Sequence, residues 1–98
     1  MSVVRHVIVK GRVQGVGYRA WTEHMALRRE LEGWVRNRRD GTVEAVFAGP
    51  EPEVAAAIEA CLRGPPGSWV SAVDAEEGEA ELLDRRRPGE RFSMLPTA

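Results

Sequence analysis

A glycine-rich stretch near the N-terminus has the composition of an anion-binding loop. It runs Gly11-Arg12-Val13-Gln14-Gly15-Val16-Gly17-Tyr18-Arg19, between a β-branched run and a helical pattern. Glycines let successive backbone N–H groups turn toward one side, and the start of the following helix adds partial positive charge. Arg19 can bind a phosphate or carboxylate through two hydrogen bonds. The same spacing also suits an ordinary tight turn with a surface arginine.

The only asparagine of the chain, Asn37, is the second candidate for chemistry. It ends the stretch Gly33-Trp34-Val35-Arg36-Asn37. An amide both donates and accepts hydrogen bonds, so it can hold a water molecule beside an anion without adding negative charge. Asparagine is also favoured in turns for local backbone reasons, and that interpretation is strong when the residue is considered alone.

The elements that must position these residues follow from hydrophobic patterns and chain breakers. Val3 to Lys10 is a β-branched run that predicts a strand, and from Tyr18 onward apolar residues recur at helical spacing. Leu31 to Arg38 predicts a second strand. Asp40-Gly41 predicts a hairpin, so Thr42 to Ala48 should pair back antiparallel.

The second half of the chain predicts a helix and two further strands. The helix begins in Gly49-Pro50-Glu51-Pro52 and ends before Gly64-Pro65-Pro66-Gly67. Trp69 to Ala75 predicts a strand, and Arg91 to Leu95 predicts a short last one. The intervening stretch from Glu76 to Glu90 is strongly charged, and we expect it to be a mobile or loosely ordered connection.

The order β-α-β-β-α-β with a short terminal strand predicts an α+β, ferredoxin-like sandwich. We expect an antiparallel sheet of four to five strands with two helices on one face, in a single domain over residues 1–98. This fold occurs in RNA-binding domains, regulatory modules and enzymes, so the function has to come from a site.

Composition narrows the class of protein. Of 98 residues, 43% are hydrophobic and 30% are charged, which is a normal balance for one globular domain. No apolar run is long enough to span a membrane, and no secretory signal is apparent. The single cysteine, Cys61, can form neither an internal disulfide nor a cysteine-based zinc site. We therefore expect a soluble, cytoplasmic protein, and no residue spacing suggests a metal or cofactor site.

The net charge of −1 hides an asymmetry along the chain. Residues 1–41 contain nine basic and four acidic residues, whereas residues 42–98 contain five basic and eleven acidic ones. A basic first half is consistent with an anionic ligand, or simply with solvated surfaces. The near-neutral total argues against wholesale nucleic-acid binding, and the aromatic residues do not form an RNA-binding pattern.

Both candidate segments resemble the motifs of a known family. Gly11 to Arg19 resembles the phosphate-loop motif of the acylphosphatases. Gly33 to Asn37, followed by Gly41, Val43 and Gly49, resembles the family's second motif with the same spacing. The resemblance extends through Val73, and Gly64-Pro65-Pro66-Gly67 is part of it.

The resemblance implies the function and the role of each candidate residue. Arg19 would bind the substrate phosphate, Asn37 would orient the attacking water, and the backbone of Gln14, Gly15, Val16, Gly17 and Tyr18 would cradle the phosphate. The protein would then hydrolyse a small acyl phosphate to a carboxylate and inorganic phosphate without a metal, as a monomer that needs neither membrane nor nucleic acid. A carboxylate is a weak base, so it leaves without a general acid.

The sequence departs from the family's pattern at the end of the first helix, and it leaves one alternative function open. Where the family usually has Leu-Gly-Leu at the end of the first helix, this chain has Arg29-Glu30-Leu31. Glu30 therefore either tolerates a strained backbone or ends the helix differently. The alternative function is a non-catalytic anion-binding or regulatory module, which would use the loop but would have no need for Asn37.

Overall fold

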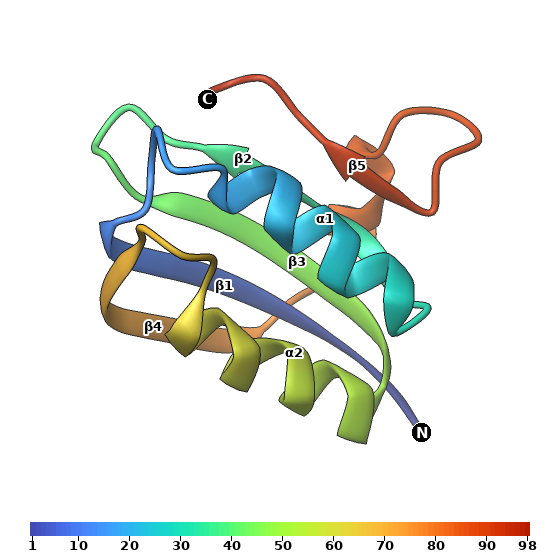
Figure 1. Ribbon diagram of the computed structural model, residues 1–98. Helices are drawn as coiled ribbons and strands as arrows, with labels where there is room; N and C mark the ends of the chain where they lie inside the picture. The colour runs from blue at the N-terminus through green and yellow to red at the C-terminus, as the bar shows by residue number, and fades with distance from the viewer.

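The computed structural model describes all residues 1–98. The elements are β1 (Ser2–Arg12), α1 (Tyr18–Arg28), β2 (Glu32–Asn37), β3 (Val43–Pro50), α2 (Glu51–Arg63), β4 (Trp69–Glu77), the 3₁₀ helix η1 (Ala80–Arg85) and β5 (Phe92–Met94). The strands form one sheet in the order β4-β1-β3-β2-β5, and α1 and α2 cover the same face of it (Figure 1). The predicted ferredoxin-like α+β fold is confirmed.

The sheet is mixed, whereas the sequence predicted a wholly antiparallel sheet. β1 pairs antiparallel with β3 and β4, and β2 pairs antiparallel with β3. β5, however, runs parallel to β2, with Val35 opposite Met94 (Figure 1). A parallel neighbour needs a long connection, and the chain between β4 and β5 is long enough to carry β5 back in the direction of β2.

The core lies between the helices and the sheet face that they cover. On β1, alternate residues such as Val7 and Val9 point to this face and are fully buried. Phe47 from β3 and Phe92 from β5 stack with their ring centroids 5.9 Å apart. Burial of such side chains stabilises the fold by about 1.5–3 kcal/mol each. The site residues described below lie at one end of this layer.

The prediction of a loosely ordered connection over residues 76–90 was wrong. β4 continues through Glu77, and Gly78 then donates its N–H to Val4 at 3.0 Å. η1 lies against β2, where the Trp34 indole donates to the carbonyl of Leu82 at 2.7 Å. The fully buried Trp34 needs this partner on the sheet face that the helices leave open. The sequence pattern could not show it, because the two residues are 48 positions apart.

α1 ends in a Schellman turn with glutamate where glycine is the usual residue. Glu30 has φ = 59°, in the left-handed region. Leu31 N–H donates to the Ala26 carbonyl at 2.9 Å, and Glu30 N–H donates to that of Leu27 at 3.0 Å, which are the two bonds of this motif. Glu30 therefore keeps the family-like helix end and adopts the strained backbone.

Replacement of Glu30 with glycine should therefore stabilise the protein. A side chain in this conformation costs about 1–2 kcal/mol, and the greater flexibility of glycine in the unfolded chain offsets part of the gain. We expect Glu30→Gly to raise the free energy of unfolding by about 0.5–1 kcal/mol in urea denaturation. As a control, Ala55→Gly in the exposed middle of α2 should lower it by about 1 kcal/mol. Destabilisation by Glu30→Gly would contradict the assignment of strain.

Candidate functional site

The residues predicted from two separate motifs line one small pocket. The pocket has a volume of about 160 Å³ and lies where the β1–α1 loop, the end of β2 and β5 meet. Its lining consists of Val13, Gly15, Gly17, Tyr18, Arg19, Ala20, Asn37 and Met94. Of the predicted site residues, Gln14 and Val16 do not line it. Arg19 and Asn37, 18 positions apart in the sequence, therefore face a common space.

The loop uses glycine where the backbone requires it. Gly15 has φ = 74° and Gly17 has φ = 79°, both in the left-handed region. No atom lies within 4 Å of where a side chain would begin at either glycine, so conformation and not crowding demands them. α1 starts directly after Gly17, and its first turn contains no acidic residue. The positive end of the helix dipole is therefore not neutralised locally.

Arg19 is a half-buried cation without an acidic partner. Its guanidinium forms no ion pair and no hydrogen bond within the chain, whereas seven arginine and lysine side chains form ion pairs elsewhere. The planar guanidinium presents donors in a fork that matches the oxygens of phosphate or carboxylate. The pocket therefore has a charged donor group available for an anion.

Tyr18 fixes the start of α1 to the end of α2. Its hydroxyl donates to the Cys61 carbonyl at 2.6 Å, and its own carbonyl accepts from the Thr22 hydroxyl at 2.9 Å. A side chain at Gly64 would begin only 2.7 Å from the Tyr18 ring. Burial raises the pKa of Tyr18 far above its ordinary value, so the phenol stays protonated. The side chain of Tyr18 thus anchors the helix that carries Arg19.

Asn37 carries a buried acceptor without a partner. The Oδ1 atom of Asn37 is shielded from solvent and accepts no hydrogen bond. Leaving such a group unpaired costs about 1–3 kcal/mol, and unsatisfied buried groups are rare enough to indicate a functional role. The backbone of Asn37 is held by the β2–β3 pairing with Val43 and by the N–H of Ala98, which donates to the Asn37 carbonyl at 3.0 Å.

Two features of the site escaped the sequence analysis. The Gln14 side chain does not face the pocket but donates from Nε2 to the carbonyls of Arg38 at 2.7 Å and Thr42 at 2.8 Å. Its rarity was a usable signal, because Gln14 is the only glutamine of the chain. Met94 lines the pocket because β5 runs beside β2, and nothing in the local sequence indicates that pairing.

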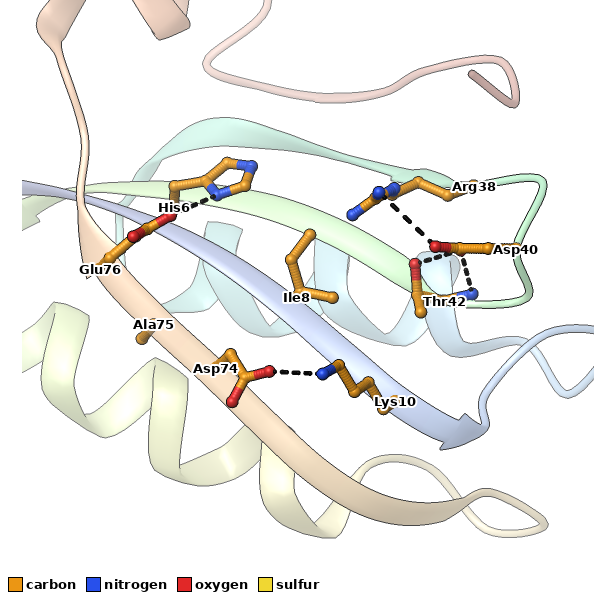
Figure 2. Close-up of a pocket in the computed structure, with 9 residues that line it drawn as sticks. All are labelled: His6, Ile8, Lys10, Arg38, Asp40, Thr42, Asp74, Ala75 and Glu76. Atoms are coloured by element: carbon orange, nitrogen blue, oxygen red, sulfur yellow. Dashed lines mark hydrogen bonds and ion pairs between the residues drawn. The ribbon is translucent and has the colours of Figure 1, made fainter.

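A larger groove on the open face of the sheet offers no comparable anion site. Its volume is about 440 Å³ (Figure 2). Its cations lie beside carboxylates, Lys10 with Asp74 at 2.9 Å and Arg38 with Asp40 at 3.5 Å, and the His6 imidazole lies 3.9 Å from Glu76. Opposite charges at these distances largely neutralise one another. The groove also lies on the sheet face that points away from Asn37.

Arg36 is also engaged on that open face. Its Nε donates to Glu44 at 2.6 Å, and its guanidinium carbon lies 4.7 Å from the centre of the Trp34 ring. Burial opposes the ionisation of Glu44, but hydrogen bonds from His6 and Arg36 hold the pKa of Glu44 below its ordinary value. Arg36 therefore pairs with a carboxylate and is not available to a ligand of the pocket.

The remaining reactive groups do not form a second centre. No group of three or more His, Cys, Asp and Glu side chains is arranged to hold a metal ion. Burial raises the pKa of the Cys61 thiol to about 11, so the thiol is not poised as a nucleophile. No helix has both the length and the apolar character needed to cross a membrane.

Comparison with known proteins agrees with this geometry. The family model described as Acylphosphatase matches residues 5–92. An acylphosphatase of Rhodopseudomonas palustris strain BisB18 is 59% identical over 98% of this chain and 97% of its own length. The crystal structure of an acylphosphatase from Bacillus subtilis is 40% identical with a TM-score of 0.81, covering 97% of this chain and 99% of that one. An acylphosphatase structure from Coxiella burnetii is 32% identical with a TM-score of 0.84, covering 96% and 93%.

These matches cover almost the entire length of this chain and of each relative, so the similarity extends over the whole fold and not over one motif alone. They include the β1–α1 loop and the end of β2, the two segments that build the pocket. The chain is therefore a hydrolase that belongs to the acylphosphatase family.

Proposed function

We propose that this protein hydrolyses acyl phosphates through a water held by Asn37, with the phosphate bound by Arg19 and the backbone of residues 14–18. The observation that supports it best is one shared pocket, lined by a cation without an acidic partner and by an amide without a hydrogen bond. The substrate is a small acyl phosphate, and the products are a carboxylate and inorganic phosphate. The reaction needs no cofactor.

The reaction requires the protein to position a water and to stabilise the charge on the phosphoryl oxygens, and little else. In an acyl phosphate the leaving group is a carboxylate, so no general acid is needed to protonate it. Transfer of the phosphoryl group spreads charge over three equatorial oxygens, while the attacking and leaving oxygens lie roughly in line. A site that stabilises these oxygens and aligns one water can therefore catalyse the reaction without a metal ion.

Arg19 and the loop stabilise the phosphoryl oxygens. The guanidinium donates to two of them at once, which fixes their orientation as well as neutralising charge. Glycines 15 and 17 allow the backbone N–H groups of the loop to approach a third oxygen closely. The start of α1 adds its partial positive charge on the same side.

Asn37 orients the attacking water. Its amide is neutral, so it can lie beside a phosphate without repelling it. A half-turn about the Cβ–Cγ bond exchanges the oxygen and nitrogen of the amide, so the side chain can accept a proton of the water or donate to its oxygen. A water that donates to Oδ1 would also satisfy the buried acceptor. The leaving carboxylate departs on the opposite side of the phosphorus.

Asn37→Ala should abolish turnover and spare phosphate binding, because Arg19 and the loop remain. We expect kcat for benzoyl phosphate to fall by at least about 100-fold, with the inhibition constant of inorganic phosphate little changed. Asn37→Asp keeps the shape of the side chain but should weaken phosphate binding through charge repulsion. Retained turnover in Asn37→Ala would refute the water-holding role, whereas a wild-type protein that binds inorganic phosphate without any turnover would favour a non-catalytic anion-binding module.

Arg19→Ala should lose both affinity and activity. Removal of the only charged donor in the pocket should raise the inhibition constant of inorganic phosphate by at least about tenfold. Arg19→Lys should recover part of the affinity but little of the rate, because an ammonium lacks the fork geometry. Arg28→Ala, at the exposed far end of α1, is the matched control and should behave like the wild type. Normal phosphate affinity in Arg19→Ala would rule out the assignment.

A further inference from the structure

The phosphate loop and the strand that carries Asn37 are joined by one side chain. Gln14 Nε2 directs both of its hydrogens to the β2–β3 hairpin, reaching the Arg38 carbonyl at 2.7 Å and the Thr42 carbonyl at 2.8 Å. No backbone hydrogen bond links residues 13–16 to this hairpin. The half-buried carboxamide of Gln14 is thus the polar connection between the two parts of the site.

The two acceptor carbonyls belong to a rigid turn directly after Asn37. Arg38 N–H donates to the Thr42 carbonyl at 2.9 Å, and Gly41 N–H donates to that of Arg38 at 3.1 Å. The Asp40 carboxylate accepts from the backbone N–H of Thr42 at 3.0 Å and from its hydroxyl at 2.7 Å. Gln14 therefore contacts a turn whose own geometry is fixed, one residue away from Asn37.

A carboxamide suits this arrangement. Two carbonyl acceptors need two donors, and the NH₂ group of Gln14 supplies both without adding charge. An ionised glutamate of the same length would place a carboxylate against two carbonyl oxygens and repel them. Both N–H donors of the Gln14 side chain are therefore used by the hairpin.

We propose that the Gln14 side chain is a positioning residue, which sets the separation between the phosphate loop and Asn37 and thereby the alignment of the attacking water. The proposal rests on the function proposed above. Arg19 is held from the helix side through Tyr18, whereas Asn37 is held from the sheet side. Gln14 spans these two independently anchored parts. A misplacement of about 1 Å at such a site can lower the rate about 100-fold.

Kinetics of Gln14→Met give the first test, because methionine keeps the length of the side chain and removes both donors. We expect kcat for benzoyl phosphate to fall between about 10-fold and 100-fold. The inhibition constant of inorganic phosphate should change by less than about threefold, since Arg19 and the loop glycines are intact. A kcat within about twofold of wild type would overturn the proposal. So would a loss of affinity for inorganic phosphate as large as the loss in kcat.

A control variant that is destabilised elsewhere in the fold distinguishes an effect on the position of Asn37 from a general loss of stability. Trp34→Phe also removes a 2.7 Å side-chain hydrogen bond to a carbonyl, but on the open face of the sheet. It should lower the melting temperature and leave kcat within about twofold at temperatures where the protein is folded. If Trp34→Phe lost kcat as Gln14→Met does, the effect of Gln14 would be general destabilisation.

NMR gives a readout that does not depend on turnover. The chain contains one asparagine and one glutamine, so a ¹H–¹⁵N spectrum has only two carboxamide NH₂ pairs. Gln14→Met deletes one pair and so identifies the other as Asn37. We expect the Asn37 pair to shift in Gln14→Met, while the backbone signals of the loop still respond to inorganic phosphate. An unchanged Asn37 pair would show that Gln14 does not set the environment of Asn37.

The same variants distinguish this proposal from the proposed function. In an Asn37→Ala background, Gln14→Met should lower the residual turnover by less than about twofold, because there is no longer an aligned water to misplace. A full additional loss would overturn the positioning role. If Asn37→Ala alone keeps wild-type turnover, the proposed function fails. If Asn37→Ala is inactive but Gln14→Met equals wild type, only the role of Gln14 fails.

Discussion

The register of three antiparallel strands is the constraint on which the site depends. Val9 of β1 pairs with Val43 of β3, and Val43 pairs with Asn37 of β2, so the three side chains form one row across the sheet. The two valines are fully buried under the helices, which places Asn37 on the same covered face. A slip of one residue would turn Asn37 to the open face, where the charged groove lies. Hydrophobic burial thus fixes the direction of a polar side chain.

Each half of the site is anchored to a different layer. Arg19 depends on α1, whose first residue is hydrogen-bonded to α2, whereas Asn37 depends on the sheet. The pocket between them carries a cation without an acid and a buried acceptor without a donor, and the unpaired acceptor costs stability in the free protein. In the proposed mechanism, a water that donates to this acceptor removes that cost. The free energy that the fold gives up here is available for binding and alignment.

Local patterns predicted most of the fold, and they pointed to two residues that line one pocket. Asp40-Gly41 between two strand-like runs was enough to predict the β2–β3 hairpin, and the motif resemblance named Arg19 and Asn37. The parts that were missed depend on distant partners. Residues 76–90 are held by distant partners, through the hydrogen bonds of Gly78 to Val4 and of Trp34 to Leu82. The direction of β5 comes from its pairing with β2. Similarly, Gln14 belonged to the predicted loop, but the destination of its side chain depends on a turn 24 to 28 residues away.

In the proposed mechanism a water attacks phosphorus and the carboxylate leaves. Hydrolysis of benzoyl phosphate in ¹⁸O-labelled water is the decisive measurement, because the label marks the atom that the water attacks. We expect one ¹⁸O atom in inorganic phosphate and none in benzoate. Label in benzoate would mean attack at the carbonyl carbon, which contradicts both the role of Arg19 and that of Asn37.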